Sequence, residues 1–320
     1  MEKKLTGKRT PLLGAWGVAD LGTNTFQFLI AEKNAIGINE IVNTQETVRL
    51  GEGGINKGII LSAPFERGIA AMLKFKGLLK QYGVEEVRAI ATSALRNAAN
   101  GPAFVEEVKS KTGIAIEIID GDKEAGFVYK GIVASGILTE PNSLIIGIGG
   151  GSVEFIIGNR NGIIWKASVE IGCARLMDKF HQIDPIPAKA INKLNEYLSE
   201  VLNPLFIAVA LHEVQNIIGA SGPFETYVGL IELGKGNNFN LKKVKVYRFQ
   251  QEELVKLLNQ LIISSHAQRA NNPGIIPIRV DMIVSASLIT RYVMEELNLH
   301  NVIMTTNSLK EGVMADMLII

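Results

Sequence analysis

Residues 18–30, Val18-Ala19-Asp20-Leu21-Gly22-Thr23-Asn24-Thr25-Phe26-Gln27-Phe28-Leu29-Ile30, decide how this chain folds. An apolar run ends at Asp20, a glycine and small polar residues follow, and a second run then places Phe26, Phe28 and Ile30 at alternate positions. Period-2 alternation after a glycine-containing break is typical of a tight β-hairpin. Small polar residues in such a turn leave backbone N–H groups free to bind one anion. The stretch therefore predicts a hairpin whose turn holds a phosphate-sized group.

The same pattern returns at residues 145–157, Ile145-Ile146-Gly147-Ile148-Gly149-Gly150-Gly151-Ser152-Val153-Glu154-Phe155-Ile156-Ile157. A gap-free overlay of the two copies pairs Asp20 with Gly147, Gly22 with Gly149, Thr25 with Ser152 and Gln27 with Glu154. A unit that occurs twice indicates two similar halves facing one another. Two anion-binding turns across one cleft would form a phosphate-handling site. The alternative is a pair of ordinary hairpins with glycine-rich turns.

The composition is that of a globular protein with a sizeable core. The 320 residues suggest about two domains. Hydrophobic residues make up 47% of the chain and charged residues 20%, which argues against disorder. The formal net charge of +1 gives no support for binding to nucleic acid or to a membrane surface.

The cellular compartment is predicted from cysteine content and from the absence of long apolar runs. Cys173 is the single cysteine, so no internal disulfide can form, which fits a reducing compartment. Residues 1–10 are basic and lack the apolar stretch of a secretory signal, and we interpret them as a frayed tail. No apolar run approaches the ~20 residues of a membrane span. We expect a soluble, cytoplasmic protein.

Strands and helices alternate along the chain. In the first half, strands are predicted at 36–48, 87–92 and 114–119, with helices starting at Ser62 and covering 103–111. This alternation predicts an α/β layer. The second half begins at Ser143, and in it we expect a long helix over 279–297, a last strand over 302–305 and a closing helix over 309–318.

Three polar features of the sequence each fit either a structural or a functional interpretation. Glu124 lies at the first turn of a helix predicted over 126–134, where a carboxylate is favoured by the helix dipole alone. Ser221-Gly222 ends a strand and could seat a phosphate or a ribose, or could simply start a helix. Lys242, Lys243 and Lys245 fit a solvated edge strand, or a track for polyphosphate.

An ordered set of motifs resembles the exopolyphosphatase/guanosine pentaphosphate phosphohydrolase (Ppx/GppA) family from about Trp16 onward. These motifs are Asp20-Leu21-Gly22-Thr23-Asn24-Thr25, Val48-Arg49-Leu50-Gly51-Glu52-Gly53, Thr92-Ser93-Ala94-Leu95-Arg96, Lys123-Glu124-Ala125, Gly149-Gly150-Gly151-Ser152-Val153-Glu154, Gly172-Cys173-Ala174-Arg175-Leu176, Ser221-Gly222, Arg279-Val280-Asp281 and Lys310-Glu311-Gly312.

The resemblance implies an α/β fold of two ribonuclease-H-like domains around a central cleft, as in the actin-like/sugar-kinase-like ATPase superfamily. We expect residues 1–125 to form the first domain and 126–305 the second, with a helix over about 306–320 packing back on the first. The chain looks like a short form without the additional C-terminal helical domains of longer members.

The resemblance also implies a hydrolase that releases terminal orthophosphate from polyphosphate or guanosine pentaphosphate with Mg²⁺ or Mn²⁺. Glu124 matches the general base, Glu154 a second acidic residue, and Asp20 and Glu154 are the expected metal ligands. Arg49 lies in a motif whose arginine is expected to face the cleft. The expected phosphate-binding residues are Gly22, Thr23, Asn24, Thr25, Arg96, Gly149, Gly150, Gly151, Ser152, Ser221 and Gly222. We expect no nucleic-acid or membrane partner, and a homodimer is left open.

Two departures from the family pattern set up a second hypothesis. Gly147 stands where the family usually has an aspartate that helps to hold metal, and Lys310 stands where an arginine is usual. A glycine cannot ligate through a side chain, so the cleft could instead bind polyphosphate or a guanosine polyphosphate without hydrolysing it. An ATP-dependent kinase of the same superfamily is a third interpretation, less favoured by the order of the motifs.

Overall fold

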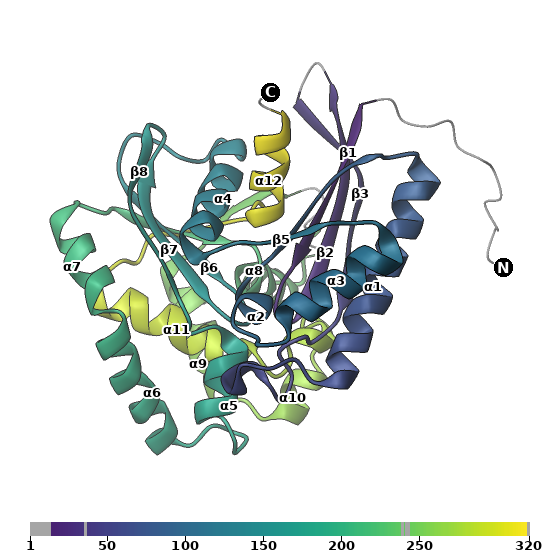
Figure 1. The fold of residues 1–320 in the computed structure, drawn as a ribbon. Coiled ribbons are helices and arrows are strands. Elements are labelled where there is room, and N and C mark those ends of the chain that lie inside the picture. Colours follow the sequence, from purple (N-terminus) through teal and green to yellow (C-terminus); the bar gives the residue numbers. More distant parts are fainter. Residues whose placement is uncertain (1–13, 35–36, 238–239, 241–243, 319–320) are drawn as a thin grey trace.

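The computed structural model describes residues 14–34, 37–237, 240 and 244–318, and two β-sheets organise these residues (Figure 1). The frayed tail expected over residues 1–10, and Lys242 and Lys243, lie outside the described residues. The first sheet has the strand order β3-β2-β1-β4-β5. Its strands are β1 (Ala15–Leu21), β2 (Thr25–Asn34), β3 (Gly37–Thr47), β4 (Glu86–Ala91) and β5 (Ile116–Ile118). β1, β2 and β3 pair antiparallel, whereas β4 and β5 continue parallel to β1.

The second sheet repeats this topology. Its order is β10-β11-β9-β6-β7-β8. The strands are β6 (Ser143–Ile148), β7 (Val153–Asn159), β8 (Gly162–Val169), β9 (Asn216–Ala220), β10 (Val246–Arg248) and β11 (Val302–Thr305). With the edge strand β10 set aside, the first three strands again form an antiparallel meander and the next two run parallel to the first of them. This matched pair of sheets confirms the expected α/β fold of two ribonuclease-H-like halves.

Helices cover the outer faces of both sheets (Figure 1). In the first half, the stacked rings of Phe28 on β2 and Phe75 on α1, with centroids 4.5 Å apart, join sheet to helix. The helices here are α1 (Ser62–Tyr82), α2 (Ser93–Arg96) and α3 (Gly101–Thr112), with a 3-10 turn η1 at Ile55–Lys57. In the second half the helices are α5 (Cys173–Phe180), α6 (Ala188–Val201), α7 (Asn203–Leu211), α8 (Pro223–Gly234), α9 (Gln251–Ile263), α10 (His266–Ala270) and α11 (Ile283–Glu296). None of the described helices has both the length and the apolar character needed to cross a bilayer.

The helix expected over 279–297 starts later than predicted. Residues Pro277–Arg279 form the 3-10 helix η2, and α11 covers Ile283–Glu296. Pro277 favours a local turn here, because its ring fixes φ and removes a backbone donor. The apolar periodicity includes residue 280 and so gave no sign that the α-helix begins only at Ile283.

Two helices, α4 (Gly121–Ala134) and α12 (Leu309–Leu318), lie side by side between the sheets (Figure 1). Their apolar residues share one buried cluster with Val18 and Leu29 of the first sheet and with Ile145 and Ile218 of the second. α12 also contacts β1 and β2. The expected domain division at residue 125 falls within α4, and it stays a prediction.

Glycines let these two helices approach closely. A Cβ on Gly312 would lie 1.8 Å from the backbone oxygen of Phe127, and a Cβ on Gly131 would lie 2.0 Å from that of Ser308. Because backbone atoms cannot move aside as a flexible side chain can, both positions require glycine.

We expect Gly312→Ala to lower the free energy of unfolding by about 1–3 kcal/mol, the usual cost of inserting a methyl group into a packed contact. Urea denaturation followed by circular dichroism measures this change. Gly77→Ala is the control, because Gly77 lies in α1 with nothing within 4 Å of its added Cβ. That variant should be neutral or more stable by about 0.5–1 kcal/mol. Equal effects of the two substitutions would contradict the close contact.

Candidate active site

The two predicted turns have the same geometry and meet each other. In the first turn the Gly22 N–H donates to the Thr25 carbonyl at 3.1 Å, and in the second the Gly149 N–H donates to the Ser152 carbonyl at 3.0 Å. A Cβ on Gly150 would lie 2.1 Å from Asn24 Nδ2. On the sequence alone the turns could have been unrelated hairpins, but in the structure they form one continuous surface.

Neighbouring loops bind the carbonyl groups of both turns. The Gly51 N–H donates to Thr23 and the Arg49 N–H to Asn24, at 3.1 and 2.8 Å. At the second turn, the N–H groups of Cys173 and Ala174 donate to the carbonyls of Gly149 and Gly150 at 2.9 and 2.8 Å. Since these carbonyls are engaged, each turn is left with N–H groups and side-chain hydroxyls to offer a ligand. That chemistry suits an anion.

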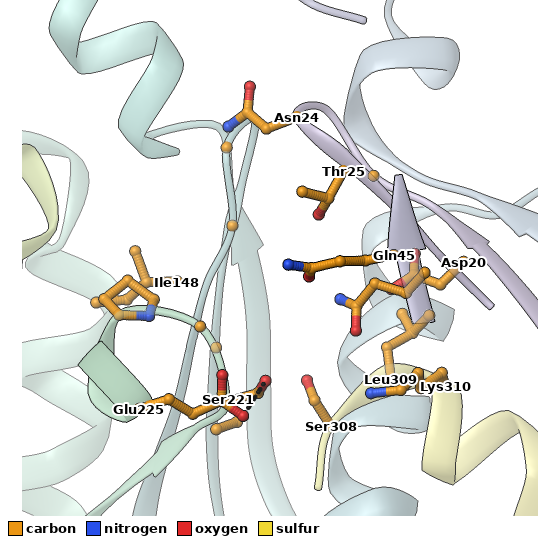
Figure 2. A pocket seen from close by; sticks show the side chains of 18 of the residues that line it. Asp20, Asn24, Thr25, Gln45, Ile148, Ser221, Glu225, Ser308, Leu309 and Lys310 are labelled. Carbon is orange, nitrogen blue, oxygen red and sulfur yellow. Dashed lines mark hydrogen bonds between the residues drawn. The ribbon is translucent and has the colours of Figure 1, made fainter. Parts of the chain in front are cut away.

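A cavity of about 570 Å³ opens beside the paired turns. Figure 2 shows Thr25, Gln45, Asp20 and Lys310 on one wall, with Ile148, Ser221 and Glu225 on the other. Ten of the eleven predicted phosphate-binding residues are among those that line this cavity: Gly22, Thr23, Asn24, Thr25, Gly149, Gly150, Gly151, Ser152, Ser221 and Gly222.

Three buried carboxyl groups reach the same cavity from different elements. Asp20 is on β1, Glu154 on β7 and Glu124 in the first turn of α4, and their exposed fractions are 9%, 4% and 6%. Asp120 caps α4 by accepting a hydrogen bond from the Lys123 N–H at 2.7 Å, which fixes where the helix starts. All three predicted catalytic residues therefore lie on the walls of one cavity.

Burial alters the acidity of these groups. It raises the pKa of Asp20 to about 7, with the nearby charge of Glu124 adding to the effect and Lys310 opposing it. Burial also raises the pKa of Glu124, against the opposing hydrogen bond from Arg96. The pKa of Glu154 is raised well above its usual value by burial and by the charge of Glu124. A carboxylate kept basic in this way is suited to accept a proton.

The donor set fits a magnesium ion that is shared with a substrate. Asp20 and Glu154 are buried carboxylates on one cavity, and Glu154 receives a hydrogen bond from Ser168 Oγ at 2.9 Å. The described residues include no group of three or more His, Cys, Asp or Glu side chains that could enclose a metal. Mg²⁺ is typically held by one or two carboxylates together with substrate phosphates and water. The residues present therefore match that mode of binding, and the role of each as a ligand stays a prediction.

Three cationic side chains, Lys245, Arg279 and Lys310, also line the cavity. Lys310, on α12, is 6% exposed and pairs with Glu311 at 2.8 Å. Arg279 is held by Glu225 at 3.0 Å, and Ser221 Oγ donates to the same carboxylate at 3.2 Å. Lys245 forms an ion pair with Glu40 at 3.1 Å. Each of these cations is thus paired with a carboxylate that also lines the cavity.

Two predicted arginines, Arg96 and Arg49, are not among the described residues that line the cavity, and their roles stay predictions. Arg96 Nη1 donates to Glu124 Oε2 at 2.8 Å. Arg49 pairs with Glu52 and approaches Asp281 of the second half at 3.9 Å. Sequence reasoning missed Glu170, which also binds Arg96 at 2.8 Å. Glu170 lies between β8 and the motif Gly172-Cys173-Ala174-Arg175-Leu176, and its nearness to that motif was the one signal in the sequence that could have found it.

The sequence profile of the Ppx/GppA phosphatase family matches residues 29–319. The chain belongs to that family. Membership agrees with the motifs from which the resemblance was inferred, and the actin-like two-domain fold expected of the family is the fold observed.

Among relatives in the Ppx/GppA family, the crystal structure of an exopolyphosphatase from Cytophaga hutchinsonii superposes with a TM-score of 0.92 at 36% identity. That match covers 95% of this chain and 97% of the other. A bifunctional 3-dehydroquinate synthase/phosphatase from Fusobacterium nucleatum is 30% identical over 305 residues, or 90% of this chain. A guanosine-5'-triphosphate,3'-diphosphate pyrophosphatase from Photobacterium profundum is 23% identical over 312 residues, or 97% of this chain. The chain spans 44% and 61% of the lengths of the last two proteins.

We expect Asp20→Asn to stabilise the metal-free protein at pH 8. A carboxyl whose pKa is raised on folding contributes stability that is lost as pH rises, so the charged Asp20 side chain is unfavourable above pH 7. The gain should grow between about pH 4 and pH 7 and reach the order of 1–4 kcal/mol, at 1.36 kcal/mol per pKa unit. Thermal unfolding in the presence of a chelator measures it.

The control for this prediction is Asp316→Asn. Its ion pairs with Arg88 and Lys130 lower the pKa of Asp316, so its charge stabilises the fold at pH 8. That variant should unfold at a lower temperature than the parent protein. An Asp20→Asn variant less stable than the parent would contradict the pKa direction given for Asp20.

Proposed function

We propose that this protein hydrolyses terminal phosphoanhydride bonds, with inorganic polyphosphate as the first candidate substrate and guanosine pentaphosphate as the second. The observation that carries the proposal is the contact between the two anion-binding turns beside the buried carboxylate of Glu124. Neighbouring phosphoryl groups of one substrate would lie on the two turns, with the terminal group facing Glu124.

In the proposed reaction, a water oxygen attacks the terminal phosphorus and the bridging P–O bond breaks. The water proton passes to Glu124, orthophosphate leaves, and the shortened substrate remains. The N–H groups of the turns and the side chains of Lys310 and Arg279 would neutralise the phosphoryl oxygens, which is the main requirement of phosphoryl transfer. Mg²⁺ or Mn²⁺ held by Asp20 and Glu154 would supply further neutralisation of substrate charge.

The names of the relatives support a phosphatase but divide on the substrate. One related structure is called an exopolyphosphatase, and another relative a guanosine-5'-triphosphate,3'-diphosphate pyrophosphatase. Both names fit hydrolysis of a terminal phosphoanhydride bond. The first of these proteins matches nearly its full length to this chain, and we therefore place polyphosphate first.

We expect Glu124→Gln to lower orthophosphate release by roughly 10²–10⁴-fold, the usual contribution of a general base. The amide keeps the size of the side chain but cannot take the proton. Release of orthophosphate from polyphosphate and from guanosine pentaphosphate, measured side by side with Mg²⁺ and with Mn²⁺, tests the prediction. Glu140→Gln, at an exposed glutamate, is the control. Full activity of the Glu124 variant would reject its assignment as the base.

A binding protein without turnover is the second candidate function, and Gly147 is the observation that favours it. Gly147 faces Glu154 across the β6–β7 pair, in the position that Asp20 occupies in the first sheet. The second half therefore lacks a carboxylate at this point. In this case substrate would bind, as measured by calorimetry, and no orthophosphate would be released with any divalent ion.

Gly147→Asp tests whether the missing carboxylate limits metal binding. An added Cβ would lie 3.6 Å from Glu154 Oε2 and 3.7 Å from Val128, which are ordinary contacts, so the first side-chain atom fits without displacing a neighbour. We expect Mg²⁺ affinity to increase by roughly 10–100-fold, similar to the effect of other groups that support a metal site. Isothermal calorimetry measures this, and Gly147→Asn controls for volume without charge. Equal affinities of the Asp and Asn variants would contradict the prediction.

We propose a reducing, cytoplasmic location, consistent with the single buried Cys173, whose pKa burial raises to about 12. No nucleic acid or membrane partner is invoked, because the near-neutral net charge supplies no driving force for either. A homodimer stays open.

A further inference from the structure

Glu170 bridges the two halves of the chain next to the proposed base. It lies directly after β8, and its side chain is 39% exposed. Oε1 accepts a hydrogen bond from Arg96 Nη2 at 2.8 Å, and Oε2 accepts one from Ser93 Oγ at 2.5 Å. Arg96 and Ser93 belong to α2 in the first half, so one carboxylate of the second half holds two side chains of the first.

Arg96 is thereby shared between two glutamates. Its Nη1 donates to Glu124 Oε2 at 2.8 Å and to the Ile119 carbonyl at 3.1 Å, and its Nη2 is bound to Glu170. A guanidinium and a carboxylate commonly form two parallel hydrogen bonds. Here Glu124 receives a hydrogen bond from only one guanidinium nitrogen of Arg96, and Glu170 accepts a hydrogen bond from the other.

The carboxylate of Glu170 also contacts Arg175, which binds the backbone of the second turn. Arg175 Nη2 pairs with Glu170 Oε2 at 2.9 Å, while Arg175 Nε donates to the carbonyl of Gly151 at 2.9 Å. A continuous series of contacts thus runs from the backbone of the second turn, through Arg175, Glu170 and Arg96, to Glu124. It connects the place where a phosphoryl group would lie with the group that would activate water.

We propose that Glu170 is a positioning residue that keeps Arg96 from pairing with both oxygens of Glu124, so that one oxygen stays available to the attacking water. The assignment of Glu124 as the base rests on the proposed function, whereas the effect of Glu170 on Arg96 does not. Nothing in the family motifs marks position 170, and the inference rests on the contacts of this chain alone.

The first test is the crystal structure of the Glu170→Ala variant. Without the carboxylate, Arg96 should rotate so that both terminal nitrogens lie within hydrogen-bond distance of the two oxygens of Glu124. Glu170→Gln, which keeps the volume and an acceptor oxygen, should show a smaller change and serves as the second variant if the alanine variant does not fold. An unchanged Arg96 in the variant structure would overturn the proposal, and this result does not depend on turnover.

The second test is kinetic, with orthophosphate release from polyphosphate as the readout. Glu170→Ala should lower kcat by roughly 10–100-fold with little change in KM, the loss expected when a catalytic group is misplaced by about 1 Å. Glu170→Gln should recover part of that loss. Glu140→Ala is the matched control, because Glu140 also pairs with an arginine, Arg160, but is exposed and is not among the described residues that line the cavity.

A double-mutant cycle with Arg96→Lys shows whether the effect passes through Arg96. A lysine cannot form the two parallel bonds, so Glu170→Ala should cost little further activity in that background. An equal loss in both backgrounds would overturn the proposal. If the parent protein released no orthophosphate, the proposed function would fail, and the position of Arg96 in the variant structure would still decide the role of Glu170.

Discussion

The contact between the two glycine turns is the constraint on which the rest of this molecule depends. Gly150 and Gly151 lie against Thr23, Asn24 and Ser93 at distances that leave no space for a Cβ. A neighbouring loop holds each of these turns by hydrogen bonds. Each loop has a glycine where it contacts its turn: Gly51 contacts the first turn and Gly172 the second. The absence of side chains at these points allows the turns of the two halves to meet in one surface.

The two repeated units place their acidic residues on different strands, so the cavity is asymmetric. Both sheets place a strand-turn-strand unit at the cavity, but the first unit contributes its acid from the strand before the turn and the second from the strand after it. Asp20 faces Gln27, and Gly147 faces Glu154. One fold repeated twice can therefore offer two different sets of groups to a single ligand, with α4 adding Glu124 from between the sheets.

The sequence predicted those parts of the structure that local patterns determine. Period-2 alternation and glycine placement located both hairpins, and their gap-free repeat predicted that they would face one cavity. It did not predict the contacts of Arg96, because a motif identifies a residue type and not its partners. Glu170 was missed for the same reason, since its partners Ser93 and Arg96 are distant in the sequence. The start of α11 was predicted too early. The helical spacing of apolar residues begins before Ile283, in a segment where the backbone forms a turn instead of an α-helix.

Lys310 and its neighbours on α12 have a consequence for the assembly of the protein during translation. The cavity takes Asp20 and the first turn from the start of the chain, but it gains its buried lysine only from a helix near the last described residues. Until that helix has left the ribosome, the apolar face of α4 that it covers stays open to solvent. A nascent chain can thus complete its first sheet early and still acquire the lysine of the cavity only after α12 has been synthesised.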